Sequence, residues 1–403
     1  YTYGDMEAQA ASMRVAARRV HALIEKYGLD SVLLAMQKLL EDGEKYARLK
    51  LKELPKGEFE AEDYIDSAIA QTEEPVYVRA KIKITEDKFL VDFTGSGKQV
   101  MSPINSPFPA TVSGVRETYM ALTDPHAHPN AGFFKPLEVI APPGTVFHPV
   151  KPAPTSTDWE AIAYATDLVW KALAPHVPEK LTAGHFVSIL ATIVGGVDDR
   201  TGEPFAIVEP QPGGWGAGYD MDGTSGLVAC GDGETYIASS EVYEKNFPIM
   251  VERYMLNTED GVGDGKFRGG FGVIREYRIL NSTALVTLQV GRHDFPPWGV
   301  DGGLPGPGNK IFLYRGGKVE EIRRISGEVL KKGDLISFHS SGGGGWGDPL
   351  ERDPERVLQD FKNELITLDI AENVYGVKID PEKMEIDWET TEQLRGRLKR
   401  ERK

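Results

Sequence analysis

The chain has 403 residues, of which 40% are hydrophobic and 27% charged, so it is long enough for two or three folded domains and contains no disordered bulk. Its formal net charge of -15 argues against nucleic acid and anionic membranes as partners. No apolar run approaches the roughly 18 residues of a membrane-spanning helix, and the single cysteine, Cys230, excludes an internal disulfide framework and fits a reducing, cytoplasmic environment.

Residues 1–73 are predicted to form a helical hairpin. Apolar residues recur every three or four positions from Met6 to Tyr27, Gly28 fits the end of this helix, and Asp30 fits the N-cap of a second helix that runs to about Leu51. The chain starts at Tyr1 inside the helical pattern, and no signal peptide is visible. We therefore expect an N-terminal portion that is missing or carried on another chain.

Residues 74–210 are predicted to form an α/β region. Apolar and polar residues alternate from Val76 to Phe93 around a turn at 85–87, which is typical of an antiparallel hairpin. The later elements expected here are helices over 111–122, 158–174 and 183–194, and a strand over 205–208.

Two motifs in this region are weak as ligand sites. The run Thr94-Gly95-Ser96-Gly97-Lys98 resembles half of a phosphate loop but lacks the G-x-x-x-x-G-K-[ST] spacing, so we do not assign ATP to it. His126 and His128 form an H-x-H pair among prolines. Because no third ligand lies nearby, surface histidines on a loop are favoured over a metal site.

Residues 211–350 are predicted to be rich in strands and glycine turns, with strands over 272–280, 284–292, 311–315, 319–325 and 334–339. The stretch 257–277 holds six glycines within twelve residues, together with Lys266 and Arg268. Charges among such glycines indicate a ligand loop or a tightly folded turn. A second glycine block, 213–218, is followed by acidic residues suited to a divalent cation, but it lacks the calcium-loop spacing.

Residues 351–403 are predicted to hold a helix behind Asp353 as N-cap, followed by a charged, solvated tail from about Asp387. The fold class expected for the whole chain is therefore mixed α+β, with a helical hairpin, an α/β middle and a β-rich, glycine-rich C-terminal half. The region boundaries are placed after residues 73, 210 and 350.

Taken in order, the glycine blocks and the segments between them resemble the hydantoinase B/oxoprolinase family. This family includes B subunits of N-methylhydantoinases, the C-terminal half of 5-oxoprolinase, and large subunits of acetone and acetophenone carboxylases. The matching stretches span nearly the whole chain: 103–107, 130–136, 139–144, 213–216, 241–248, 265–272, 342–349, 351–354 and 371–377. Where many members read Asn-x-Glu, this chain has Asp158-Trp159-Glu160, so the glutamate alone is retained.

The resemblance implies one subunit of an ATP-dependent hetero-oligomer that hydrolyses a cyclic amide resembling hydantoin or 5-oxoproline. The alternatives are a subunit of a biotin-independent ketone carboxylase and a non-catalytic scaffold of such a complex. ATP with Mg²⁺ is then expected on a partner subunit that resembles hydantoinase A. A divalent metal, Zn or Mn, is expected in an N-terminal region of family members that this chain does not contain.

Such chemistry requires cations or N–H groups for phosphate and oxyanion, and a general base. Lys266 and Arg268 are the candidates for the cations, and Glu160, Glu241 and Glu244 are the candidates for the base. All of them except Lys266 have a structural alternative. Glu160 suits helix capping, the two later glutamates share a helical face that suits ion pairing, and Arg268 suits a hub that ties glycine turns together. Cys230 is interpreted as a small hydrophobic residue.

Overall fold

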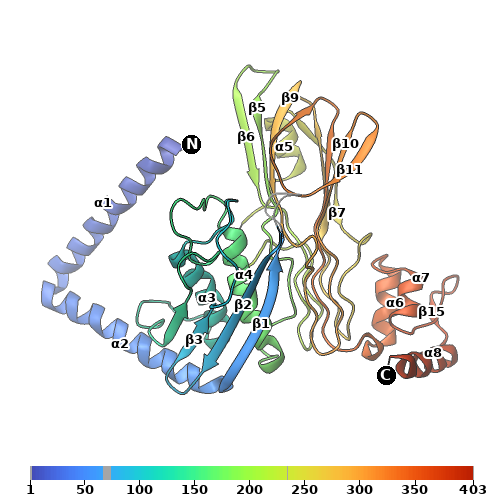
Figure 1. Ribbon diagram of the computed structural model, residues 1–403, viewed down its shortest axis with the longest axis horizontal. Helices are drawn as coiled ribbons and strands as arrows, with labels where there is room; N and C mark the ends of the chain where they lie inside the picture. The colour runs from blue at the N-terminus through green and yellow to red at the C-terminus, as the bar shows by residue number, and fades with distance from the viewer. Residues whose placement is uncertain (1, 67–73, 234, 403) are drawn as a thin grey trace.

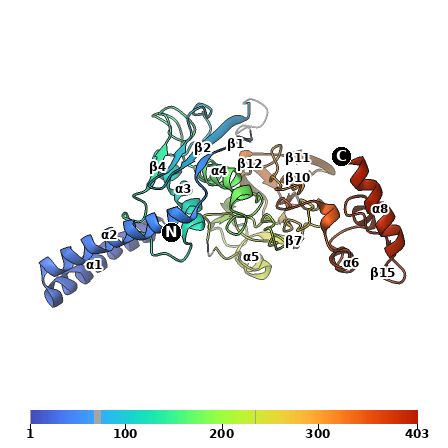
Figure 2. The same ribbon diagram turned by 90° about the horizontal axis from the view of Figure 1, so that it is seen from below.

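The computed structural model describes residues 2–66, 74–233 and 235–402. A helical arm projects from a central body, and a small C-terminal module lies at the opposite end (Figures 1 and 2). Among the described residues, buried hydrophobic side chains gather into one cluster beneath a helix-covered sheet, one between two packed sheets, and one in the C-terminal module. The mixed α+β class expected from the sequence is confirmed, whereas the boundaries after residues 73, 210 and 350 stay predictions.

The arm consists of α1 (Thr2–Tyr27) and α2 (Leu29–Glu53), as the apolar spacing predicts. Gly28 joins them at φ +82°, a backbone region that favours glycine, and its N–H donates to the carbonyl of Ile24. Asp30, expected at the N-cap, lies in the first turn of α2 because this helix starts directly after Gly28. The buried residues of α2, Ala47 and Leu51, lie near its C-terminal end, where it joins the body.

A four-stranded sheet in the order β1-β2-β3-β4 forms the first half of the body. Strands β1 to β3 are antiparallel, and β4 runs parallel to β3. Helices α3 and α4 pack together beside this sheet, with α4 against β1 and β2. Because β1 pairs with β2 along its whole length, the sheet crosses the predicted boundary at residue 73. The elements are β1 (Gly57–Ile65), β2 (Val76–Ile84), β3 (Phe89–Asp92), α3 (Phe108–Thr123), β4 (Leu137–Ile140), α4 (Trp159–Leu173) and the 3-10 turn η1 (Ala174–His176).

Two antiparallel sheets form the second half of the body, one in the order β11-β10-β13-β8-β7 and one in the order β12-β9-β5-β6. Their side chains share one hydrophobic cluster, to which β5 contributes Val194, β9 contributes Val286, and β13 contributes Phe338. The short helix α5 (Ser240–Asn246) leads into β7. The strands are β5 (Ala191–Val197), β6 (Pro204–Glu209), β7 (Ile249–Leu256), β8 (Val273–Ile279), β9 (Thr283–Gln289), β10 (Lys310–Arg315), β11 (Lys318–Ile322), β12 (Ile325–Lys331) and β13 (Leu335–His339).

The glycine-rich segments form a bundle of extended chains between the two halves, here called the glycine bundle. It comprises residues 182–186, 213–218, 261–272, 298–306 and 340–347, which exchange backbone hydrogen bonds. Three successive N–H groups of its central segment, those of Gly343, Gly344 and Gly345, donate at 2.8–2.9 Å to three different segments. Their acceptors are the carbonyls of Gly270, Gly184 and Leu304. Donors that turn in this way indicate three residues per turn, as in polyproline II and collagen.

The C-terminal module follows the last glycine segment and has its own small core. Its helices begin at side-chain caps, since the carboxylates of Asp353 and Asp387 and the hydroxyl of Thr367 each accept a backbone N–H of the first turn. The elements are the 3-10 turn η2 (Pro349–Glu351), α6 (Pro354–Lys362), α7 (Leu368–Asn373), β14 (Ile379–Asp380), β15 (Glu385–Ile386) and α8 (Trp388–Glu401).

Two expectations about local structure were wrong. The helix expected over 183–194 is an extended segment followed by β5, because Ala183 and Gly184 donate to other segments of the glycine bundle rather than within a helix. The tail expected from Asp387 is α8, which buries Leu394 and whose Arg395 donates to the carbonyls of Tyr375 and Arg352. Strands β1 and β12 were not expected as separate elements. Among the described helices, none is apolar and long enough to cross a membrane.

We predict that Gly344→Ala severely destabilises the fold. A Cβ at this position would lie 1.9 Å from the carbonyl oxygen of Trp298, which is backbone and cannot rotate away. The free energy of unfolding should fall by about 3 kcal/mol or more, at or above the usual cost of overpacking, as measured by urea denaturation.

The matched control is Gly396→Ala in α8, where the nearest atom to the new Cβ lies at 3.9 Å. This change should leave stability unchanged or raise it by up to about 1 kcal/mol, because alanine favours helix. Equal effects of the two substitutions would contradict the assignment of Gly344 to a close-packed backbone crossing.

Candidate active site

The N-terminal turn of α4 places one carboxylate in the interior, between the two halves of the body. Glu160 is fully buried, and its Oε1 accepts a hydrogen bond from Ser188 Oγ at 2.6 Å. Its Oε2 accepts from Arg324 Nη2 at 3.0 Å. A Cβ on Gly291 would lie 2.5 Å from the same Oε2, so a larger residue there would force this carboxylate to shift. We call Glu160, Ser188, Gly291 and Arg324 the Glu160 cluster.

The backbone around this cluster is held in an unusual conformation. Val187, Leu190 and Arg292 all have positive φ, at 57°, 49° and 60°, and they flank Ser188 and Gly291. Positive φ values are uncommon for residues other than glycine, and for the β-branched Val187 such a value is an outlier. Each costs about 1–3 kcal/mol, and strain of this kind concentrates at functional sites. This strain is the structural signal that singles out the cluster.

His185 supports the strained turn before Ser188. Its Nδ1 accepts a hydrogen bond from the N–H of Val187 at 2.9 Å, and its ring packs against those of Trp215 and Phe186. Burial lowers the pKa of His185 to about 4. The ring is therefore neutral near pH 7, which the accepted hydrogen bond at Nδ1 requires.

A second set of buried charges adjoins the Glu160 cluster through Arg292, which follows Gly291. The Arg292 guanidinium donates to Asp63 Oδ2 at 2.9 Å and to Asp167 Oδ2 at 2.5 Å, and it lies over the ring of Tyr164. Trp298 Nε1 donates to the same Asp167 carboxylate. We call Asp63, Tyr164, Asp167, Arg292 and Trp298 the Arg292 cluster, which joins β1, α4 and the glycine bundle.

The environments of the buried carboxylates drive their pKa values apart. Burial raises the pKa of Glu160 above its ordinary value, although the Arg324 guanidinium opposes this. Burial also acts to raise the pKa of Asp63, but Arg292 and Lys171 outweigh it and hold that pKa below its ordinary value. Glu160 therefore retains a proton more readily than an ordinary carboxyl, whereas Asp63 stays ionised, and carboxyls whose environments push their pKa values apart are typical of acid–base sites.

Several buried polar atoms around the two clusters have no hydrogen-bond partner within the part of the chain that the structure describes. They include Tyr164 Oη, Arg292 Nε, Arg324 Nη1 and His293 Nε2. Buried donors rarely remain unpaired in native proteins, so these groups are available to a water molecule, an ion or a bound substrate. Asp66, by contrast, accepts the N–H groups of His293 and Asp294 and fixes the loop that follows Arg292.

The other predicted site residues lie elsewhere. Glu241 and Glu244 are exposed on α5, where Glu244 accepts the N–H of Val251 at 3.0 Å. Lys266 is exposed, and its ammonium lies 5.9 Å from the ring centroid of Phe267. No hydrogen bond or ion pair joins these side chains to Glu160 within residues 2–66, 74–233 and 235–402.

Arg268 is half-buried against the C-terminal module. Its guanidinium donates to Asp360 at 3.2 Å and lies over the ring of Phe271. Arg352 binds the same Asp360 and also Asp222, whose carboxylate accepts the backbone N–H of Arg268. These contacts fit the structural alternative for Arg268, a hub between a glycine turn and α6. Its catalytic role, like those of Lys266, Glu241 and Glu244, stays a prediction.

Sequence reasoning missed most of both clusters. Asp167 lies seven residues after Glu160, which places both on one face of α4, and two acids on an otherwise apolar face were a usable signal. Arg292 is the last residue of a predicted strand, 284–292, and begins a run of charged residues, which is a weaker signal. Ser188 lies in a segment interpreted as helix, so nothing in the sequence pointed to it.

The H-x-H pair and Cys230 both lie apart from the two clusters. His126 and His128 are exposed on a loop, and among the described residues no group of three or more His, Cys, Asp or Glu side chains is arranged to hold a metal ion. Cys230 lies 3.9 Å from a Glu117 oxygen, and burial raises the pKa of its thiol, so the thiolate that a nucleophile needs is disfavoured.

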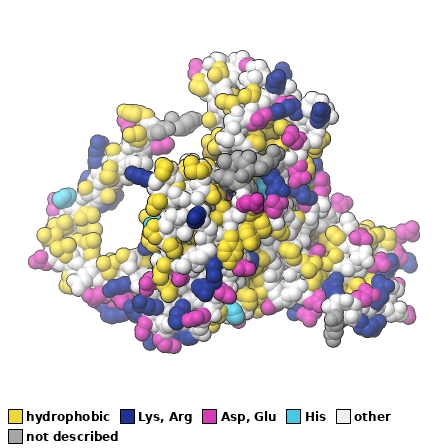
Figure 3. Space-filling model, in the orientation of Figure 1, with side chains coloured by type: hydrophobic (Ala, Val, Ile, Leu, Met, Phe, Trp, Pro, Cys, Tyr) yellow, Lys and Arg dark blue, Asp and Glu magenta, His cyan; other side chains and the backbone are white. Residues whose placement is uncertain are grey.

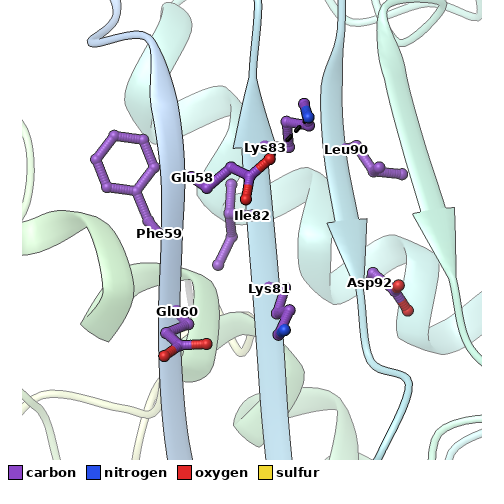
Figure 4. Close-up of a pocket in the computed structure, with 8 residues that line it drawn as sticks. All are labelled: Glu58, Phe59, Glu60, Lys81, Ile82, Lys83, Leu90 and Asp92. Atoms are coloured by element: carbon purple, nitrogen blue, oxygen red, sulfur yellow. Dashed lines mark hydrogen bonds and ion pairs between the residues drawn. The ribbon is translucent and has the colours of Figure 1, made fainter.

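A depression of about 440 Å³ crosses the outer face of β1 to β3 (Figure 4). Its charged side chains stand in opposite-sign pairs across the strands, with Glu58 opposite Lys83 and Glu60 opposite Lys81. Lys83 Nζ and Glu58 Oε1 form an ion pair at 2.7 Å. This pattern is typical of a solvated sheet face, so we do not assign the site to it.

The chain matches the family model described as hydantoinase B/oxoprolinase over residues 1–349. It is 33% identical over 413 residues to the B subunit of a putative D-/L-hydantoinase of Pseudomonas sp. strain NS671, a match that covers 97% of this chain and 67% of that protein. The crystal structure of an ATP-dependent caprolactamase from Pseudomonas jessenii is similar over 98% of this chain and 69% of the other, with a TM-score of 0.85 and 26% identity.

The structure of a nucleotide-free acetone carboxylase is also similar, with a TM-score of 0.86 over 96% of this chain and 58% of the other. At 19% identity this likeness shows a shared fold alone.

We predict that His185 makes folding stability depend on pH. Its folded-state pKa of about 4 lies below the ordinary 6.5, so the unfolded chain binds the proton first as the pH falls. Stability is therefore full above about pH 6.5 and decreases toward pH 4, by up to about 3 kcal/mol. Urea denaturation between pH 7 and pH 4 should show a shallower slope for His185→Gln than for the wild type.

The control is His126→Gln, which removes an exposed histidine and should retain the wild-type slope. If His185→Gln and the wild type lose stability in parallel over this range, His185 is not buried in its neutral form.

Proposed function

This chain belongs to the hydantoinase B/oxoprolinase family, and on that premise we propose that it is one subunit of an ATP-dependent enzyme that opens a cyclic amide by hydrolysis. The observation that carries the proposal is the likeness to the ATP-dependent caprolactamase along nearly the whole chain. The B subunit of a putative hydantoinase is a relative of similar extent. Hydantoin and caprolactam are both rings closed by an amide, so the substrate class we infer is a cyclic amide.

We infer that the nucleotide binds on a partner subunit. The hydantoinase relative is named as one subunit, which implies a complex with another, and the half-motif at 94–98 does not fit a phosphate. The N–H of Ser96 donates to the carbonyl of Phe93, and that of Gly97 donates to the carbonyl of Tyr77. These donors are already used within the chain, whereas a phosphate loop must present free N–H groups.

Within this chain we assign proton transfer to Glu160. Amide hydrolysis requires a base for the attacking water and an acid for the leaving nitrogen, and a carboxyl with a raised pKa suits both tasks. Tyr164 and Arg324 supply unpaired donors nearby for an oxyanion. Because Glu160 has no exposed surface, the role requires that Arg324 be displaced from it when substrate enters. That displacement also removes a cation that lowers the pKa of Glu160.

A direct test of the function uses the chain co-expressed and purified with its ATP-binding partner. ATP hydrolysis that depends on a cyclic amide and yields the ring-opened acid without bicarbonate supports the proposal. ATP hydrolysis that requires bicarbonate and a ketone selects the carboxylase alternative, and a lack of either activity in an intact complex contradicts both.

We predict that Glu160→Gln lowers turnover of the assembled enzyme at least ~10²-fold, the usual contribution of a general acid–base group. The neutral amide keeps the size and the hydrogen bond to Ser188 but cannot exchange a proton. Glu355→Gln, which changes an exposed glutamate in the first turn of α6, is the matched control and should leave turnover unchanged. Near-normal turnover of Glu160→Gln, with an unchanged circular dichroism spectrum, would remove Glu160 from the chemistry.

A further inference from the structure

The imidazole of His293, the residue after Arg292, has one bonded and one unbonded nitrogen. Its Nδ1 lies 2.8 Å from the carbonyl oxygen of Asn309. Because a carbonyl oxygen can only accept, Nδ1 carries a proton and donates the hydrogen bond. The neutral ring then has its lone pair at Nε2, which is buried and has no hydrogen-bond partner among the described residues. A histidine held in this way can accept a proton at Nε2.

Asn309 holds the turn that carries His293 through all of its polar groups. Its N–H donates to the carbonyl of Arg292 at 2.8 Å, and its Nδ2 donates to the carbonyl of Gly291 at 2.6 Å. Its Oδ1 accepts the N–H of Ser341, in the glycine bundle, at 2.7 Å. Together with the bond from His293, these contacts connect the strained turn to the bundle. The fold therefore fixes both the position and the tautomer of the imidazole.

His293 and Glu160 lie around the same buried charges. The Asp66 carboxylate accepts the N–H of His293 at 2.9 Å and also acts to raise the pKa of Glu160. Arg324 donates to Glu160, and its positive charge also acts to lower the pKa of the His293 imidazole. The Nε of Arg324 donates to the carbonyl of Val290, three residues before His293. The carboxyl and the imidazole therefore belong to one site.

This site lies just beneath the surface. Asp294 and Arg323, the chain neighbours of His293 and Arg324, are exposed. They form an ion pair in which Arg323 Nη2 lies 2.6 Å from Asp294 Oδ1. Figure 3 shows acidic and basic side chains gathered on one face where the two halves of the body meet. Since each buried group is one residue away from an exposed one, opening of this ion pair would give water and substrate a short path to the site.

His293 and Glu160 are suited to opposite tasks near pH 7. Burial lowers the pKa of His293 below its ordinary value of 6.5, so the ring is neutral and able to accept a proton. Burial raises the pKa of Glu160, so this carboxyl retains a proton more readily. Groups whose pKa values are separated by their environments are suited to the roles of acid and base. The charged groups that act on the ring are Asp66, Asp294, Arg323 and Arg324.

We propose that His293 is the general base of the ring opening and Glu160 its general acid, with Asn309 as the residue that positions the imidazole. This assignment rests on the proposed function and divides its two proton transfers between two groups. His293 Nε2 takes a proton from the attacking water, whose oxygen bonds to the amide carbon. The C–N bond breaks, and Glu160 gives its proton to the leaving nitrogen. The imidazolium then returns a proton to the Glu160 carboxylate, which restores both groups.

The test is the turnover of hydantoin and caprolactam by the assembled enzyme that carries His293→Asn. The asparagine amide nitrogen can replace Nδ1 and keep the hydrogen bond to Asn309, but it supplies no basic lone pair. We expect turnover at least ~10²-fold below the wild type, with an unchanged circular dichroism spectrum. His128→Gln, on an exposed loop, is the matched control and should retain wild-type turnover. Near-normal turnover of His293→Asn would overturn the assignment, because only a structural imidazole can be replaced without loss.

The pH profile of kcat/KM separates a base from a structural residue. Protonation of Nε2 removes the base, so wild-type kcat/KM should decrease as the pH falls, with a midpoint below about 6.5. This decrease should be absent from the residual activity of His293→Asn. His185 is present in both proteins, so its effect on stability at low pH is common to them. A decrease that the variant retains contradicts the proposal. If the variant does not fold, the wild-type profile decides, since a midpoint above about 6.5 or no decrease contradicts the proposal by itself.

The same measurements distinguish this assignment from the function on which it rests. A wild-type enzyme that opens neither ring with ATP would overturn the proposed function and the assignment together. A wild-type enzyme that opens a ring, with His293→Asn equally active, would overturn the assignment alone.

Discussion

Close packing of backbone on backbone in the glycine bundle holds the two halves of the body together. Its central segment, 340–347, gives successive N–H groups to three neighbouring segments, and its backbone is approached so closely that side chains do not fit. Glycine loses more conformational freedom on folding than any other residue. This entropy cost must be offset by the backbone hydrogen bonds and close contacts of the bundle. The bundle connects the helix-covered sheet to the packed sheets.

The buried charges lie where the bundle meets α4. The segment that contains Gly184 is fixed at both ends by bundle hydrogen bonds, and it continues directly into His185 and Ser188. The segment that contains Trp298 is fixed in the same way, and its indole orients Asp167. Buried ion pairs are weak evidence for stability, because well-packed hydrophobic residues often replace them without loss. Strained backbone and shifted pKa values in the same place favour a functional reading.

Much of the fold follows from the sequence because the spacing of apolar residues and the residues that favour turns act locally along the chain. The arm, the hairpin of β2 and β3, the helix α4 and most of the later strands lie where their patterns place them. The glycine bundle escapes such reasoning because it has no side-chain period, and its partners are distant in sequence. For the same reason residues 183–194, which look helical on apolar content, are extended in the fold. Within the site, Glu160 and its helix-face neighbour Asp167 carry a sequence signal, whereas Ser188 and Arg324 reach the site by tertiary contacts alone.

If the reaction takes place beside the Glu160 cluster of this chain, and not wholly on a partner, the bound substrate must lie against that cluster. The most direct measurement is the structure of the assembled complex with a non-hydrolysable cyclic amide analogue bound. We expect the analogue within hydrogen-bond reach of Glu160, about 3 Å, with Arg324 moved away from the carboxylate. An analogue bound with no residue of this chain in contact would contradict it and would make this subunit a scaffold.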